Sequence, residues 1–164
     1  MNLVFCGPKG AGKSTVAAAY AERAGLPCIE TDRLIETLHG QGMSCREILR
    51  TSGETTFREL ERQAAARAAT EDWHIIVTGG GTLMDSGSRR LLRGDNLLVY
   101  LTAPEDVLWA RATADGIPPW LEGEDGRRRF AEQNAHRAEV LAPFADVVLD
   151  TGTGTAEDLA ATLD

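Results

Sequence analysis

Residues 3–15 have the sequence LVFCGPKGAGKST, in which an apolar run leads into a glycine-rich loop and the start of a helix. Glycines at this spacing let backbone N–H groups turn toward phosphate oxygens, and the helix N-terminus adds partial positive charge. The pattern predicts a P-loop, in which Lys13 reaches the β- and γ-phosphates of a nucleoside triphosphate and Ser14 binds Mg2+. The predicted nucleotide-binding residues are Gly10, Ala11, Gly12, Lys13, Ser14 and Thr15. The alternative is a glycine-rich turn with an incidental lysine.

Short apolar runs bounded by turn residues recur along the chain and predict buried strands. After residues 3–6 they occupy residues 27–29, 74–77, 97–101 and 147–149. Helical stretches separate them, beginning with residues 13–24, which Gly25 is expected to close. Strands that alternate with helices need crossover connections. We therefore predict an α/β, three-layer P-loop fold, with a five-stranded parallel sheet flanked by helices on both faces.

Two segments depart from a simple alternation of strand and helix. Residues 32–70 are largely helical in pattern: Ser44 and Glu47 match a capping box for a short helix, and residues 53–69 predict a longer one. Residues 114–126 combine glycines, prolines and acids. That composition predicts a mobile surface loop, and loops over the strand ends of α/β enzymes often act as lids.

Composition limits the class of protein. With 164 residues, 43% of them hydrophobic, the chain is predicted to form a single domain over residues 1–164. The net charge of −8 argues against a nucleic acid or membrane partner. No apolar run is long enough to span a bilayer, so we expect a cytoplasmic protein. We also expect it to be a monomer. The widely spaced Cys6, Cys28 and Cys45 are interpreted as reduced core thiols.

A P-loop alone does not name a reaction, because GTPases, motor ATPases and small-molecule kinases all use it. An Asn-Lys-x-Asp motif for reading a guanine base does not occur in the sequence. An assembly ATPase is usually larger. Size and motif content therefore favour a small-molecule kinase.

Three downstream segments resemble the shikimate kinase family, and the resemblance covers essentially the whole chain. They are Glu30-Thr31-Asp32, the run Gly53-Glu54-x-x-Phe57-Arg58-x-x-Glu61, and the triplet Gly79-Gly80-Gly81 after a predicted strand. The resemblance implies that Glu30 holds Mg2+ through water and that Asp32 binds the acceptor hydroxyl as candidate base. A carboxylate suits that task, because the attacking hydroxyl must be oriented and must lose its proton. The alternative for Asp32 is an N-cap of the following helix.

The same resemblance assigns the acceptor's carboxylate to two arginines. Arg58 is the first, and its planar guanidinium matches a carboxylate with two parallel hydrogen bonds. Arg137 is similar to the second, although its neighbours depart from the family pattern Arg-x-Pro-x-Tyr. Arg111 falls where the family stacks an arginine on adenine. The glycine triplet is implied to line the shikimate pocket, with the middle glycine donating its backbone N–H group to the substrate.

The predicted lid departs from the family. Ungapped alignment places Pro118 where the family has an arginine that closes on the γ-phosphate. Loss of such an arginine can cost about 10^3 to 10^5 in rate. Candidate replacements are Lys9 in the P-loop, or Arg127, Arg128 and Arg129 at the end of the loop. The expected function is ATP-dependent phosphorylation of the shikimate 3-hydroxyl, in the route to chorismate and the aromatic amino acids. The alternatives are a kinase for another polyhydroxy acid such as gluconate, or a catalytically weakened nucleotide-binding module.

Overall fold

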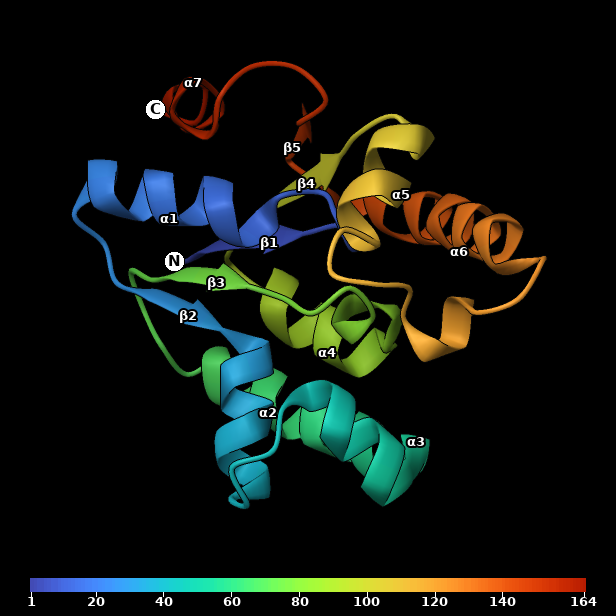
Figure 1. The fold of residues 1–164 in the computed structure, drawn as a ribbon. Coiled ribbons are helices and arrows are strands. Elements are labelled where there is room, and N and C mark those ends of the chain that lie inside the picture. The colour runs from blue at the N-terminus through green and yellow to red at the C-terminus, as the bar shows by residue number, and fades with distance from the viewer.

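The computed structural model describes residues 1–164, apart from the side chain of Pro119. It contains one five-stranded sheet with the order β2-β3-β1-β4-β5, and every neighbouring pair is parallel. The strands are β1 (Leu3–Cys6), β2 (Cys28–Glu30), β3 (Ile75–Val77), β4 (Leu97–Thr102) and β5 (Val147–Asp150). Figure 1 shows helices on both faces of this sheet. The predicted fold class is confirmed, and the strand bounds match to within one residue.

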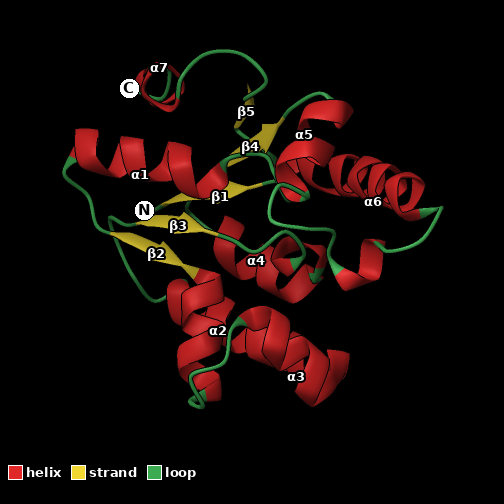
Figure 2. Ribbon diagram, in the orientation of Figure 1, coloured by secondary structure: helices red, strands yellow, loops and turns green.

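Seven α-helices and three short 3-10 turns connect the strands in the described structure (Figure 2). The helices are α1 (Lys13–Ala24), α2 (Thr31–His39), α3 (Cys45–Ala68), α4 (Ser86–Arg93), α5 (Glu105–Ala112), α6 (Gly126–Leu141) and α7 (Ala156–Ala161). The 3-10 turns are η1 (Thr82–Met84), η2 (Pro119–Leu121) and η3 (Ala142–Phe144). Gly25 ends α1 in the left-handed conformation, and Ser44 and Glu47 form the predicted capping box of α3.

Side chains alternate across the sheet and divide the core in two. Phe5, Val99 and Leu101 point to the face that α1, α5 and α7 cover. Val4 and Leu98 point to the opposite face, which packs on α4 and the end of α3. The central strands β1, β3 and β4 are thus largely buried on both faces, which explains why they are apolar runs rather than alternating ones, whereas Cys28 on β2 and Val148 on β5 are exposed.

A third, smaller core holds α2 against α3, below the sheet in Figure 1. It is built on Ile35, Ile48 and Ala64. Within α3, Gly53 has φ 84° and ψ 169°, so the predicted short and long helices meet there at a kink. Residues 32–70, the α2–α3 lobe, therefore project from the carboxyl end of β2, and the end of α3 joins them to the core beneath the sheet.

The prediction that all three cysteines are core thiols is wrong. Cys6 on β1 is buried, whereas Cys28 is exposed and Cys45 is half-buried. Cys28 begins β2, which is one of the two edge strands, and Cys45 begins α3 and lines the candidate site. An edge position and a helix start leave one side of each residue open to solvent. Spacing along the sequence could not reveal this difference.

Candidate active site

The glycine-rich loop follows β1 and wraps around the start of α1, as predicted. A Cβ atom on Gly7 would lie 2.2 Å from the Leu101 carbonyl oxygen, and one on Gly10 would lie 2.6 Å from the Leu108 carbonyl oxygen. Only glycine fits at these close approaches, and both residues have positive φ. Within the described structure, no side chain caps the first turn of α1. Its N–H groups are therefore available to a phosphate.

Lys13 lies across the loop that precedes it. Its ammonium group donates to the carbonyl oxygens of Gly7 and Pro8, at 3.0 and 2.9 Å. Burial lowers the pKa of Lys13 to about 8, and the negative charge of Asp32 opposes this shift. The lysine is positioned at the phosphate site, and its charge is sensitive to mildly alkaline pH.

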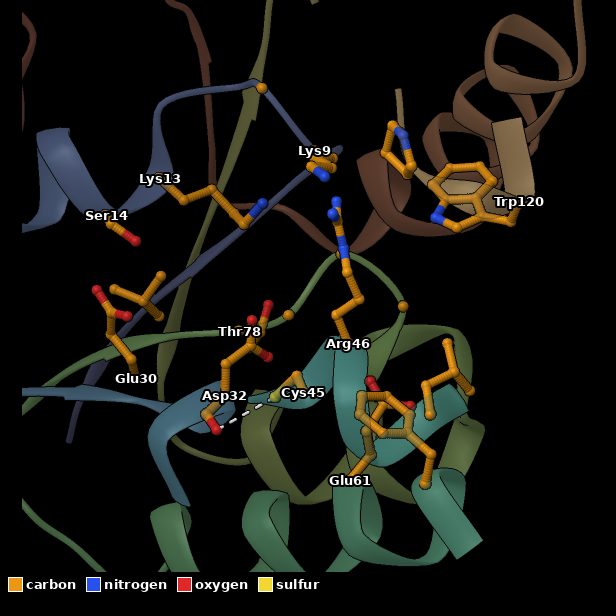
Figure 3. Close-up of a pocket in the computed structure, with 18 of the residues that line it drawn as sticks. Lys9, Lys13, Ser14, Glu30, Asp32, Cys45, Arg46, Glu61, Thr78 and Trp120 are labelled. Atoms are coloured by element: carbon orange, nitrogen blue, oxygen red, sulfur yellow. Dashed lines mark hydrogen bonds between the residues drawn. The ribbon is translucent and has the colours of Figure 1, made fainter. Parts of the chain in front are cut away.

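A pocket of about 720 Å³ joins the P-loop to the α2–α3 lobe. Its lining includes all six predicted acceptor residues: Asp32 from α2, Arg58 from α3, the three glycines that follow β3, and Arg137 from α6. Figure 3 shows Lys13 and Asp32 in this pocket, with Glu61 below them. The structure thus brings together residues that are up to about a hundred positions apart in sequence.

Each glycine of the triplet is in close contact with one of those side chains. A Cβ atom on Gly79 would lie 2.6 Å from Asp32 Oδ1, one on Gly80 would lie 3.4 Å from Arg137 Nη1, and one on Gly81 would lie 3.0 Å from Arg58 Nη1. A methyl group at Gly79 or Gly81 would displace Asp32 or Arg58, whereas one at Gly80 would need little movement of Arg137. The three glycines therefore hold a carboxylate and two guanidinium groups against one stretch of backbone.

The carboxylate of Asp32 faces the pocket from the first turn of α2. Glu30 occupies the N-cap position, and α2 starts at Thr31, directly where β2 ends. The alternative interpretation of Asp32 as an N-cap is therefore wrong, because the helix begins two residues earlier than a cap at Asp32 requires. Burial raises the pKa of Asp32, while the ammonium group of Lys13 opposes the rise. A raised pKa suits a general base.

The two arginines have different surroundings. Arg58 forms an ion pair with Glu61, which is 5% exposed and also accepts a hydrogen bond from the Thr82 hydroxyl at 3.1 Å. Arg137 has no hydrogen bond or ion pair with the residues described, and burial and the positive charge of Arg58 both lower its pKa. Arg58 also pairs with the exposed Glu54 at 3.7 Å. Two neighbouring guanidinium groups, of which Arg137 has no ion-pair partner among the described residues, favour an anionic ligand.

The mouth of the pocket carries two further cations, Lys9 from the P-loop and Arg46 from the first turn of α3. Figure 3 shows their side chains pointing toward each other beside Trp120. Burial lowers the pKa of Lys9, and so does the positive charge of Arg46, while Asp115 opposes both effects. Lys9 was a candidate from the sequence, whereas Arg46 was missed because it belongs to no motif.

The other candidate replacements for a lid arginine are held elsewhere. Arg127 pairs with Glu105 at 2.8 Å, and Arg128 pairs with Asp125 at 3.2 Å. Arg129 donates to the carbonyl oxygen of Glu122 at 2.7 Å. All three are absent from the described lining of the pocket. These three arginines therefore hold the end of the 114–126 loop and the start of α6, and they do not extend to the predicted phosphate site.

The prediction that residues 114–126 form a surface loop is right for most positions and wrong for three, Pro118, Leu121 and Gly126, the last of which begins α6. Leu121 is 1% exposed and packs into the core beside Phe130, and Pro118 is buried against the pocket. The turn η2 places these two residues inward while Trp120 stays exposed. The burial of these apolar residues could not be predicted from a segment rich in glycine, proline and acidic residues.

Arg111 connects the two loops beside the predicted nucleotide site. Its guanidinium group donates to the Thr151 hydroxyl and carbonyl oxygens at 3.0 and 2.9 Å. A longer contact of 3.4 Å reaches the carbonyl oxygen of Gly10. The Thr151 hydroxyl in turn donates to the carbonyl oxygen of Ala11 at 2.9 Å. Arg111 therefore ties the P-loop to the segment after β5.

The two residues predicted to hold Mg2+ lie near Lys13 in the pocket. Ser14 and Glu30 both line the pocket, and Figure 3 shows them on the same side of it. Among the described residues, His, Cys, Asp and Glu side chains form no group of three that could hold a metal ion. A hydroxyl and one carboxylate fit Mg2+, which keeps several waters and binds through few protein oxygens and substrate phosphates.

Comparisons with known proteins address the identity of the chain. The family model described as shikimate kinase matches residues 9–163. A shikimate kinase from Symbiobacterium thermophilum is 35% identical over 163 residues, covering 98% of this chain and 92% of that protein. One from Stenotrophomonas maltophilia strain K279a is 35% identical, with coverages of 99% and 89%. This chain belongs to the shikimate kinase family.

Solved structures agree with this assignment to the shikimate kinase family. A shikimate kinase from Acinetobacter baumannii in complex with shikimate superimposes with a TM-score of 0.90 and 28% identity, covering 99% of this chain and 89% of that one. One from Bacteroides thetaiotaomicron has a TM-score of 0.82 and 26% identity, with coverages of 99% and 96%. A gluconokinase from Sinorhizobium meliloti, with a TM-score of 0.63 and 19% identity, shares the fold alone.

The family assignment confirms the expected enzyme class, a phosphotransferase with an alcohol acceptor that uses ATP and serves aromatic amino acid biosynthesis. Two supporting residues of this shikimate kinase had no predicted role. Thr31 accepts a hydrogen bond from the Gly79 N–H group at 3.0 Å, and Glu61 pairs with Arg58. Glu61 was visible as part of the motif around Arg58.

Among the described residues, no helix is long and apolar enough to cross a membrane.

Proposed function

We propose that this kinase transfers the γ-phosphoryl group of ATP to the 3-hydroxyl of shikimate, giving ADP and 3-phosphoshikimate. The observation that carries the proposal is the match between Gly79, Gly80 and Gly81 and the side chains of Asp32, Arg137 and Arg58, in the pocket that also holds Lys13. A carboxylate beside two guanidinium groups suits an acceptor that has both a hydroxyl and a carboxylate group.

Acceptor binding is assigned to the far side of the pocket from the P-loop. Arg58 and Arg137 would grip the acceptor carboxylate with charge-assisted hydrogen bonds. The triplet would offer backbone N–H groups, because glycines allow the ligand to approach closely. Phe57 and Leu49 also line the pocket and would contact the apolar face of the acceptor ring.

Phosphoryl transfer would then take place between Asp32 and Lys13. Asp32 would orient the 3-hydroxyl and accept its proton as the new bond to the γ-phosphorus forms. The bond from the γ-phosphorus to the bridging oxygen breaks, and ADP leaves with that electron pair. Lys13 and the N–H groups at the start of α1 would stabilise the negative charge on the phosphates. Arg111 would support the adenine side of the site through its bonds to Thr151 and Gly10.

A magnesium ion is part of the proposal. Ser14 would bind it through its hydroxyl group, and Glu30 would hold it through water. When bound, Mg2+ neutralises charge on the β- and γ-phosphates. Glu30 is one methylene longer than aspartate, so an intervening water fits its reach.

The lid contributes no cation to this scheme. Residues 114–126 contain neither lysine nor arginine, and we infer that Pro118 stands where the family has its lid arginine. We assign part of that missing charge to Lys9, which lines the pocket beside the P-loop. Water exclusion would fall to the buried Pro118 and to Trp120, which also line it.

Coupled ADP release tests the acceptor directly. The enzyme is supplied with ATP and Mg2+ and with shikimate, gluconate, quinate or no acceptor. Release that depends on shikimate supports the proposal. Release with gluconate alone would assign the site to another polyhydroxy acid. Nucleotide binding without acceptor-dependent release would indicate a weakened binding module. The cytoplasmic location and the monomeric state stay predictions.

A further inference from the structure

Arg46 has an unfavourable electrostatic position. It lies in the first turn of α3, after Ser44 at the N-cap. Helix N-termini carry partial positive charge and favour acids, so an arginine there is repelled by the helix. The neighbouring Glu47 follows the usual rule and completes the capping box.

A second repulsion acts on the same side chain. Arg46 faces Lys9 across the mouth of the pocket (Figure 3), and its positive charge lowers the pKa of Lys9. Neither residue has an ion pair or a hydrogen-bonded side chain among the residues described. Two unpaired cations that face each other from different lobes are stabilised when an anion lies between them.

The location of the pair defines which anion fits. Lys9 belongs to the loop that holds the donor phosphates, whereas Arg46 belongs to the lobe that holds the acceptor. The acceptor carboxylate already has Arg58 and Arg137, against Gly81 and Gly80. The anion that passes from the P-loop to the acceptor in the α2–α3 lobe is the transferred phosphoryl group.

We propose that Arg46 and Lys9 form a clamp on the phosphoryl group during transfer, so that the α2–α3 lobe supplies the cation that residues 114–126 lack. The clamp rests on the proposed function. The γ-phosphorus exchanges its bridging oxygen for the acceptor oxygen, and the acceptor proton goes to Asp32. Arg46 would contact the γ-phosphoryl oxygens in the transition state and the phosphate of the product.

Arg46→Ala tests the clamp, with two matched controls. Arg50→Ala removes an arginine one helical turn further along α3 that also lines the pocket. Arg90→Ala removes an exposed arginine on α4, outside the site. We expect Arg46→Ala to lower kcat about 10- to 100-fold, with the KM for shikimate within about twofold. Arg46→Lys should retain part of the rate. Arg90→Ala should change kcat less than about threefold, and the loss of kcat in Arg50→Ala should be smaller than that in Arg46→Ala.

Binding measurements distinguish a clamp from a structural role. In the presence of MgADP, Arg46→Ala should weaken 3-phosphoshikimate binding about tenfold and leave shikimate binding unchanged. Its thermal midpoint should stay the same or rise by about 1 to 3 °C, because a cation leaves a helix N-terminus. A double-mutant cycle with Lys9→Ala should show non-additive losses in kcat.

Three results would overturn the clamp: an unchanged kcat for Arg46→Ala, an equal loss of shikimate and 3-phosphoshikimate affinity, or an equal loss of kcat in Arg50→Ala.

Failure of the proposed function is a separate result, in which the wild-type enzyme does not phosphorylate shikimate. In that case MgADP with aluminium fluoride, which mimics the transferred phosphoryl group, is the probe. Weaker binding to Arg46→Ala than to the wild-type enzyme supports the clamp, and equal binding rejects it.

Discussion

Glu61 holds Arg58 from one turn further along α3, and the two side chains differ in burial. The carboxylate side chain is 7% exposed, whereas the guanidinium side chain is 43% exposed and reaches the pocket. The Thr82 hydroxyl donates to the other carboxylate oxygen. A buried acid thus anchors a cation that stays accessible to ligand, which makes Glu61 a positioning residue for the acceptor site.

We predict that Glu61→Ala raises the KM for shikimate about tenfold and lowers kcat less, because Arg58 loses its orientation. Glu59→Ala is a matched control, since Glu59 pairs with Arg62 at the same spacing on the exposed side of α3. The free energy of unfolding should fall by about 1–2 kcal/mol for Glu61→Ala and by less than about 1 kcal/mol for Glu59→Ala. Equal KM values in the two variants would contradict this role.

The glycine triplet predicts a graded response to alanine. Gly79→Ala places a methyl group 2.6 Å from Asp32 Oδ1, so we expect kcat to fall at least about tenfold as the base is displaced. Gly80→Ala meets Arg137 Nη1 at 3.4 Å, where a small shift suffices, and should raise the KM for shikimate a few-fold. Steady-state kinetics and MgATP binding check both variants. A lower MgATP affinity in either one would show that the damage extends to the P-loop.

Lys9 can be tested by truncation, with Arg90→Ala as a control for loss of one exposed positive charge. If Lys9 replaces part of the lid cation, Lys9→Ala lowers kcat about 10- to 100-fold at saturating ATP and shikimate. The far-ultraviolet circular dichroism spectrum should not change, because the side chain lies at the pocket mouth. Turnover equal to that of the wild type would remove Lys9 from the mechanism.

The pKa shifts predict a narrow pH range for activity. Lys13 must be protonated to bind phosphates, and its pKa is lowered to about 8, so kcat/KM for ATP should decline as the pH rises through about 8. Asp32 must be ionised to accept a proton, and its raised pKa shifts the acid limb above the range of an ordinary aspartate. An alkaline limb near the usual lysine pKa of about 10.4 would show that Lys13 is not shifted.

Loss of the Arg111 side chain is predicted to affect the KM for ATP alone. Arg111→Ala removes the bonds to Thr151 and Gly10, so we expect the KM for ATP to rise several-fold and the KM for shikimate to stay unchanged. Arg127→Ala, which breaks an exposed ion pair with Glu105, is the comparison. A rise in the shikimate KM equal to that for ATP would mean that Arg111 supports the whole fold rather than one loop.

Much of the fold was predictable because local signals agreed with one another. Apolar runs marked strands buried on both faces, and Gly25 and Ser44 marked helix ends through backbone conformation and capping. These features depend on residues close in sequence. The kink at Gly53 also matches the predicted boundary between two helices.

The site was predictable only where motifs existed. Asp32, Arg58 and the glycine triplet were found through a family pattern, and the structure brings them into one pocket. Arg46 and Thr31 were missed because their roles depend on contacts between different elements. Pro118 and Leu121 were misjudged for a similar reason, since their burial depends on how the loop lies against the core.

The central claim is that one pocket joins ATP to the 3-hydroxyl of a carboxylate-bearing acceptor. Phosphorus NMR of the product formed from shikimate, ATP and Mg2+ tests it most directly. We predict a phosphomonoester resonance coupled to the proton on carbon 3, formed in equal amount to ADP, and lost in Asp32→Asn. Inorganic phosphate as the only product, or a phosphate on another hydroxyl, would contradict the account.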